Sequence, residues 1–170
     1  MSLEAKDVLL ANYQAQRAMG DKIIDADASL VIDHDGFEGA ELVFKEFPHP
    51  APLTSGEVAE SFGANGQKFW QATNANTAQQ GSIVLYCYAN GSTEKLLERI
   101  KNELHGKFNA IVYEGTETAH LRGYKIRDAI ITVETGTRSH ENKQQTYTLQ
   151  GQLSFHYFEE VVEGNIQTLY

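Results

Sequence analysis

Apolar and polar residues alternate most regularly near the end of the chain, over residues 146–158. One set of alternating positions is apolar or small and consists of Tyr147, Leu149, Gly151, Leu153, Phe155 and Tyr157. The other set is polar and consists of Thr146, Thr148, Gln150, Gln152, Ser154 and His156. A period of two is that of a β-strand with one buried face. We therefore predict a long strand here, with its apolar set facing a core.

Shorter apolar runs bounded by turn residues predict further strands at 29–33, 41–47, 83–89, 108–114 and 124–134. A helical period occurs at 93–104, where Leu96, Ile100 and Leu104 recur every four residues and Gly106 follows as a stop. Many strands with a single helix favour an antiparallel β-barrel or sandwich flanked by one α-helix, rather than a parallel α/β sheet.

Two segments lie outside this strand pattern. Residues 1–28 have a helical composition that Gly20 interrupts, and they predict an N-terminal arm or short helix, leaving 29–170 as a single β-barrel domain. The stretch 48–66 begins with all three prolines of the chain and is rich in Gly, Ser and Asn. Because proline cannot donate to a strand ladder, we expect a long loop that is poor in strands. Such loops are usually functional or ordered by a partner.

Composition and charge exclude several classes of protein. The net charge is −9, from 14 basic and 23 acidic residues, and the basic residues form no cluster. Tight nucleic-acid binding needs clustered Lys and Arg and is therefore disfavoured, although a surface that DNA slides past is compatible with this charge. No apolar run approaches the roughly 20 residues that span a bilayer, so we expect no membrane association. Cys87 is the only cysteine, which excludes an intramolecular disulfide.

The chain contains no strong candidate for a metal-binding, catalytic or cofactor-binding site. Asp33-His34-Asp35-Gly36 resembles part of a calcium loop, but Val31 and Leu42 would stand at its first and last ligand positions and cannot coordinate calcium. The six histidines have no short metal-ligand spacing, so only a zinc site assembled from distant positions stays open. Cys87 is expected to be a small packed thiol within a strand. We find no nucleotide-binding or nucleophile motif and expect neither a cofactor nor an enzyme.

The order and spacing of several short segments resemble the tail-tube proteins of contractile-tailed bacteriophages, which are related in fold to the type VI secretion tube protein. The resemblance covers about residues 29–160. It rests on Gly36-Phe37-Glu38-Gly39, Leu42 to Pro48, Ser55-Gly56-Glu57, Gln79-Gln80-Gly81, the predicted helix at 93–104, Gly106-Lys107-Phe108, Val112 to Gly115, Arg122 to Asp128 and Gly151 to Glu159.

The resemblance implies a structural subunit that assembles into rings, expected to be hexameric, which stack as a hollow conduit for DNA. Sheath and baseplate proteins would be its partners, and the phage tail of a virion assembled in the host cytoplasm would be its location. The uncharged polar set at 146–156 then either lines the lumen or contacts a neighbouring subunit, although an ordinary solvent-facing strand would have the same pattern. The long loop implied to contact the adjacent ring contains Pro48, Pro50, Pro52, Ser55, Gly56 and Glu57.

Three alternatives remain open at this stage. A type VI secretion-like tube shares the architecture but carries protein instead of DNA. The N-terminal arm, which lies outside the resemblance, is compatible with a baseplate or tube-initiator protein. A monomeric barrel that binds a small molecule, or an enzyme with dispersed site residues, would need an apolar interior pocket.

Overall fold

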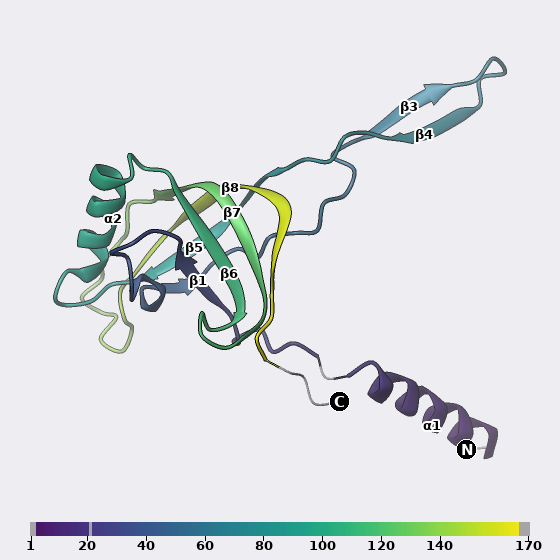
Figure 1. Cartoon of the computed structure of the whole chain (residues 1–170), viewed down its shortest axis with the longest axis horizontal. Helices are drawn as coiled ribbons and strands as arrows, with labels where there is room; N and C mark the ends of the chain where they lie inside the picture. The colour runs from purple at the N-terminus through teal and green to yellow at the C-terminus, as the bar shows by residue number, and fades with distance from the viewer. Residues whose placement is uncertain (1–2, 21, 167–170) are drawn as a thin grey trace.

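The computed structural model describes residues 3–20 and 22–166 (Figure 1). In chain order its elements are α1 (Leu3–Ala18), β1 (Ser29–Ile32), the 3₁₀ turn η1 (Ala40–Leu42), β2 (Phe44–Glu46), β3 (Val58–Phe62), β4 (Lys68–Ala72), β5 (Ala78–Tyr86), α2 (Ser92–Glu103), β6 (Phe108–Gly115), β7 (His120–Val133) and β8 (Thr148–Glu163).

Six strands form one antiparallel sheet in the order β1-β6-β7-β8-β5-β2, and this sheet curls into a nearly closed barrel (Figure 1). The predicted antiparallel barrel is therefore confirmed. The two edge strands, β1 and β2, are the shortest of the six. The turn η1 contacts both edge strands. It therefore lies at the seam between β1 and β2, where backbone hydrogen bonds between these two strands would otherwise close the barrel.

The helix α2 packs beside the same seam. Its Leu96 and Ile100 are buried in the barrel core, and the guanidinium of Arg99 lies 4.3 Å from the ring centre of buried Phe37, which belongs to the β1–η1 connection. After the helix, Gly106 has φ 80° and donates its backbone N–H to the carbonyl of Ile100, so this glycine turns the chain back at the end of the helix. The predicted helix at 93–104 is thus confirmed to within one residue.

The barrel interior is filled by the alternating apolar residues of its strands. On β8, Leu153, Phe155 and Tyr157 are buried, whereas Gln152, His156 and Phe158 are exposed. Gly151 belongs to the buried set, and a Cβ added there would lie only 2.0 Å from the carbonyl oxygen of Thr132 on β7. The alternation of apolar and polar residues thus predicted the buried face of β8 correctly.

Several boundaries differ from the prediction. Part of the strand expected at 41–47 is the turn η1, because Gly39 adopts φ 82° and starts a tight turn. The strand expected at 83–89 runs from Ala78 to Tyr86 instead, so Cys87 lies just after β5 and is half-buried. The stretch 48–66 is not poor in strands, since it contains β3, which pairs with β4 in a hairpin outside the barrel.

Two elements extend away from the barrel in different directions: the helix α1 and the β3–β4 hairpin (Figure 1). The helix α1 has 16 residues and is followed by Gly20 with φ 86°. Its apolar residues Val8, Leu9, Leu10 and Tyr13 are all exposed. In a single copy of the chain, the helix α1 and the β3–β4 hairpin therefore have no hydrophobic core to pack against.

Candidate assembly surfaces

Three surfaces of this molecule could contact other molecules, and the first is the outer face of β8. Because β8 lies between β5 and β7, its outward side chains stand in the middle of a three-stranded surface. Gln152 is opposite Ser82 on one side and Thr132 on the other, and Ser154 is opposite Gln80 and Ile130. The side-chain amide of Gln80 donates to the amide oxygen of Gln152 across the strands.

No Asp, Glu, Lys or Arg occurs in residues 78–86, 130–132 or 150–156, the segments that form this outer face. Acidic residues lie at its margins: Asp128 lines a hollow with Ser154 and His156, and Glu134 lines another with Gln150. An ion pair lies at the margin as well, where the guanidinium of Arg127 donates to both carboxylate oxygens of Glu160 at 3.0 and 2.7 Å. This bonding lowers the pKa of Glu160 and leaves the pair with no net charge. The face therefore presents neutral hydrogen-bonding groups with carboxylates at its margins, and neither attracts phosphate strongly.

Thr146 and Thr148 do not share this face fully. Thr146 precedes β8, and Thr148 is half-buried at its first position. Both threonines and Gln150 line a polar hollow of about 520 Å³ beside the 134–147 connection, where Arg138 stacks on the ring of Tyr147. The strand that we predicted from Thr146 therefore begins two residues later, at Thr148.

The second surface is the arm from Phe47 to Leu53, which joins β2 to the hairpin. Pro50 in this arm is almost fully buried, and His49 packs edge-on against Tyr124 with ring centres 4.7 Å apart. The backbone of Ala51 makes two hydrogen bonds with the side-chain amide of Gln79, at 2.9 and 3.0 Å. The backbone N–H of Leu53 donates to Glu159. The arm is thus held by its own barrel, and its first prolines are packing residues.

A short neck connects the arm to the hairpin. Ser55 forms an isolated bridge with Ala75, and its hydroxyl accepts a hydrogen bond from the backbone N–H of Thr73 at 2.8 Å. The backbone N–H of Glu57 donates to the hydroxyl of Thr73 at 2.9 Å. A Cβ at Gly56 would lie 2.8 Å from the carbonyl oxygen of Asn74, so the two chains approach closely here. Ser55, Gly56 and Glu57 therefore hold the base of the hairpin within one copy.

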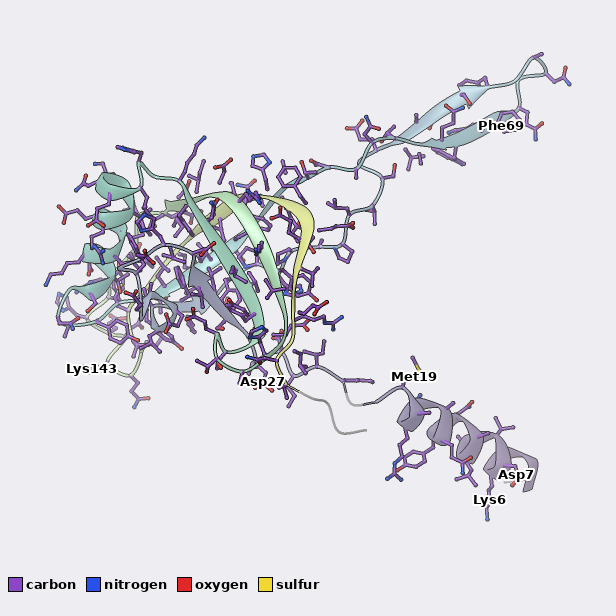
Figure 2. All side chains as sticks on the ribbon, in the orientation of Figure 1. Lys6, Asp7, Met19, Asp27, Phe69 and Lys143 are labelled. Atoms are coloured by element: carbon purple, nitrogen blue, oxygen red, sulfur yellow. The ribbon has the colours of Figure 1, made fainter. Side chains whose placement is uncertain are left out.

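The third surface is the hairpin itself, which the sequence reasoning missed. The pairing of β3 with β4 places Val58, Phe62 and Trp70 on one face, and each of these side chains is more than 60% exposed. An ion pair between Lys68 and Glu60 at 2.7 Å lies among them, with the ammonium 4.1 Å from the ring centre of Trp70. Phe69 projects from β4, well away from the barrel (Figure 2). The signal that could have found this hairpin is Asn65-Gly66, a turn dipeptide between two short runs with aromatic residues.

The described residues contain no group of three or more His, Cys, Asp or Glu side chains placed to hold a metal ion. No helix in the same residues is long and apolar enough to cross a membrane. The hollows beside the 134–147 connection and beside the arm are lined mainly by polar groups, and the interior of the barrel is packed with core side chains. This packing argues against the interior apolar pocket that a monomeric ligand-binding barrel would need.

No protein-family model matches the chain, and no curated protein matches it in sequence. Solved structures do match in fold. A chain of the PVC sheath-tube complex, from an extracellular contractile injection system in the extended state, has a TM-score of 0.52 and 13% identity. That match covers 87% of this chain and 95% of the other.

Two further matches come from the anti-feeding prophage. A chain of its tube-terminating cap has a TM-score of 0.55 and 12% identity, covering 84% of this chain and 90% of the other. A chain of its six-fold symmetrised baseplate has a TM-score of 0.50 and 15% identity, covering 87% of this chain and all of the other. The predicted resemblance to the tail-tube proteins is thus confirmed at the level of fold.

Proposed function

We propose that this chain is a structural subunit of the tube of a contractile phage tail. In this proposal, copies form hexameric rings that stack into a hollow conduit through which DNA passes into the host. The observation that carries the proposal is a barrel of the contractile-tail type bearing a hairpin whose apolar face one copy leaves uncovered.

The hairpin supports self-assembly on energetic grounds. An isolated two-stranded hairpin is marginal in water, and a cluster of exposed Val, Phe and Trp side chains marks an interaction site. Contact of the hairpin face with a copy in the adjacent ring would bury Val58, Phe62 and Trp70. The arm and the neck, from Pro48 to Glu57, would then position this inter-ring contact.

The outer face of β5, β7 and β8 is proposed to line the lumen, with Gln150, Gln152, Ser154 and His156 directed toward the passing DNA. Its neutral polar groups would remain hydrated and give the phosphates no strong partner. Sheath and baseplate proteins would surround and anchor the tube, and the assembled particle would be a virion put together in the host cytoplasm.

A second candidate function is that of a tube cap, initiator or baseplate component, or of an injection-system tube that carries protein. The fold matches support it, since they include chains of a tube-terminating cap and a baseplate. The helix α1 also fits it, because a helix with exposed apolar residues suits a subunit that joins the tube to another protein.

Negative-stain electron microscopy of the purified full chain over a concentration series tests the proposal. Rings and stacked tubes that grow with concentration are expected of a main tube subunit. Single rings that never stack would favour the cap or initiator role. Particles that stay monomeric at every concentration would contradict self-assembly, and tube formation after addition of preformed tube ends would then point to a subunit that needs an initiator.

A further inference from the structure

The β3–β4 hairpin and a polar hollow lie at opposite ends of the barrel. The pairing of β5 with β8 begins where the hairpin joins the barrel, with Ala78 opposite His156. It ends with Tyr86 opposite Thr148, about 26 Å away at about 3.3 Å per residue. The hollow of about 520 Å³ lies at this second end, where the 134–147 connection enters β8 (Figure 1). The hairpin therefore points away from the hollow of its own copy.

Copies stacked in one orientation bring the hairpin of one copy to the hollow of the next. A stack grows when two different surfaces of the same chain contact each other, because each copy then offers one surface above and the other below. Surfaces at opposite ends of the β5–β8 pair meet this requirement. A second hollow, of about 370 Å³ beside the arm, lies at the same end as the hairpin and is therefore far from the hairpin of the preceding copy.

The hollow beside the 134–147 connection offers one open cation in a neutral polar setting. Most of its lining consists of hydroxyl and amide side chains, and Glu134 and Arg138 are the only charged residues of the lining. The guanidinium of Arg138 lies 4.3 Å from the ring centre of Tyr147. None of the ion pairs among residues 3–20 and 22–166 includes Arg138, and this residue is exposed. A second aromatic ring can therefore reach the guanidinium and share it with Tyr147.

The hairpin carries groups that match this hollow. Its tip, residues 63–67, reads Gly-Ala-Asn-Gly-Gln and is small, uncharged and able to form hydrogen bonds. Trp70 follows the tip on β4 and is 64% exposed. The ammonium of Lys68 lies over one side of the Trp70 ring, but it is already paired with Glu60 at 2.7 Å. Tryptophan is the best aromatic partner of a cation, and Trp and Arg are enriched among the residues that dominate interfaces.

We propose that the hollow beside the 134–147 connection receives the hairpin tip of a second copy in the adjacent ring, and that Trp70 of that copy stacks on Arg138. The inference rests on the stacking proposed above and names the surface that the hairpin contacts. The tip brings no charge that would have to be desolvated, so its amides can exchange water for the hydroxyls and amides of the lining. The guanidinium then lies between two aromatic rings, with Glu134 in the same lining to balance its charge.

Cross-linking of the full chain tests where the tip lies. In a Cys87→Ala background, Ala64→Cys in the tip is combined with Gln145→Cys in the lining of the hollow, and a short bismaleimide joins the cysteines that meet. The matched control combines Ala64→Cys with Thr54→Cys, because Thr54 lines the other hollow, beside the arm. The assembled protein would be treated and then separated on a denaturing gel. We expect ladders of linked copies from the 64–145 pair and single copies from the 64–54 pair.

Assembly measurements test the stacking on Arg138. Arg138→Gln is compared with Lys143→Gln, which removes an equal charge from the same connection but outside the lining. Light scattering measures the concentration at which assemblies appear. We expect Arg138→Gln to raise it about tenfold, which corresponds to about 1.4 kcal/mol, and Lys143→Gln to leave it unchanged. Added to Trp70→Ala, Arg138→Gln should have little further effect, because both side chains act in one contact.

The outcomes separate this contact from the proposed function. Assemblies that give no 64–145 links and tolerate Arg138→Gln would overturn the contact and leave the tube proposal standing. Links from the 64–54 pair would place the tip at the arm of a neighbour, which also overturns the contact. A wild type that never assembles, with or without preformed tube ends, would overturn both. If the cysteine variants fail to assemble, Arg138→Gln and Lys143→Gln decide, and equal assembly concentrations for the two overturn the contact.

Discussion

Pro48 lies directly over Gly81 of β5, so close that a Cβ on residue 81 would be 2.3 Å from the Cβ of Pro48. Gly81 alternates with the buried residues Ile83 and Leu85, so the contact is on the interior side of the strand. The arm that begins at Pro48 therefore passes over the core side of β5 before it leaves the barrel, and this packing directs the hairpin outward.

Gly81→Ala is expected to displace the arm, because the proline ring has few ways to move aside. We expect a loss of about 1–3 kcal/mol in the free energy of unfolding. Thermal unfolding followed by circular dichroism measures it, with Ser82→Ala on the outer face as the control. Equal melting temperatures for the two variants would mean that the arm is not packed on β5.

Gly151→Val should be more damaging, since the clash is with the backbone of the neighbouring strand. A Cβ there would lie 2.0 Å from the carbonyl oxygen of Thr132, so β7 and β8 must separate locally. A loss of at least about 3 kcal/mol is expected. Gln152→Val places the same side chain on the exposed face of β8 and should change stability by less than about 0.5 kcal/mol. A native-like melting curve for Gly151→Val would show that the strand is not packed as described.

Trp70 is the only tryptophan of the chain, so emission excited at wavelengths that tyrosine does not absorb reports on the hairpin alone. If copies cover the hairpin, the emission of Trp70 should shift to shorter wavelength and lose its accessibility to acrylamide as assemblies form. Trp70→Ala should raise the assembly concentration by about tenfold or more, as large aromatic anchors of interfaces do. Its barrel should melt as the wild type does, because Trp70 lies outside the core. Normal assembly of Trp70→Ala would remove the hairpin from the interface.

Lysines at Gln150 and Gln152 test the lumen assignment. Two positive charges per copy on the outer face of β8 should make tubes retain short DNA at low salt, because each lysine can displace counterions from phosphate. Gel filtration of tubes mixed with labelled DNA measures retention. Glu94→Gln with Glu98→Gln on α2 is the matched control, since it raises the net charge by the same two units per copy away from that face. Equal retention by both pairs would contradict a lumen lined by β8.

The Arg127–Glu160 pair predicts a dependence on pH. Hydrogen bonding from Arg127 lowers the pKa of Glu160 in the folded chain, so its contribution to stability is complete above the ordinary glutamate pKa of about 4.3 and is lost as pH falls through the lowered value. Glu160→Gln should therefore melt slightly below the wild type at neutral pH and equally at acid pH. A difference that persists below that range would assign it to packing instead of charge.

The prediction from sequence was most accurate where one strand or helix carries a complete period. The alternation along β8 and the spacing of Leu96 and Ile100 on α2 report directly which side chains are buried, because each pattern repeats over several turns or residue pairs. The β3–β4 hairpin was not predicted, for the opposite reason. Its β4 strand is exposed at every position, so no buried face marks it, and the prolines before it argued for a loop.

Local periodicity and turn residues were enough to predict the antiparallel β class, the single core helix and the buried face of β8. Contacts between residues that are distant along the chain became known only from the folded structure. It placed Pro48 over Gly81, brought Gln79 to Ala51, and set Arg122 beside a buried Glu114. Such contacts join residues 8 to 33 positions apart, and no local pattern encodes them, because the free energy that selects them comes from packing and burial over the whole barrel.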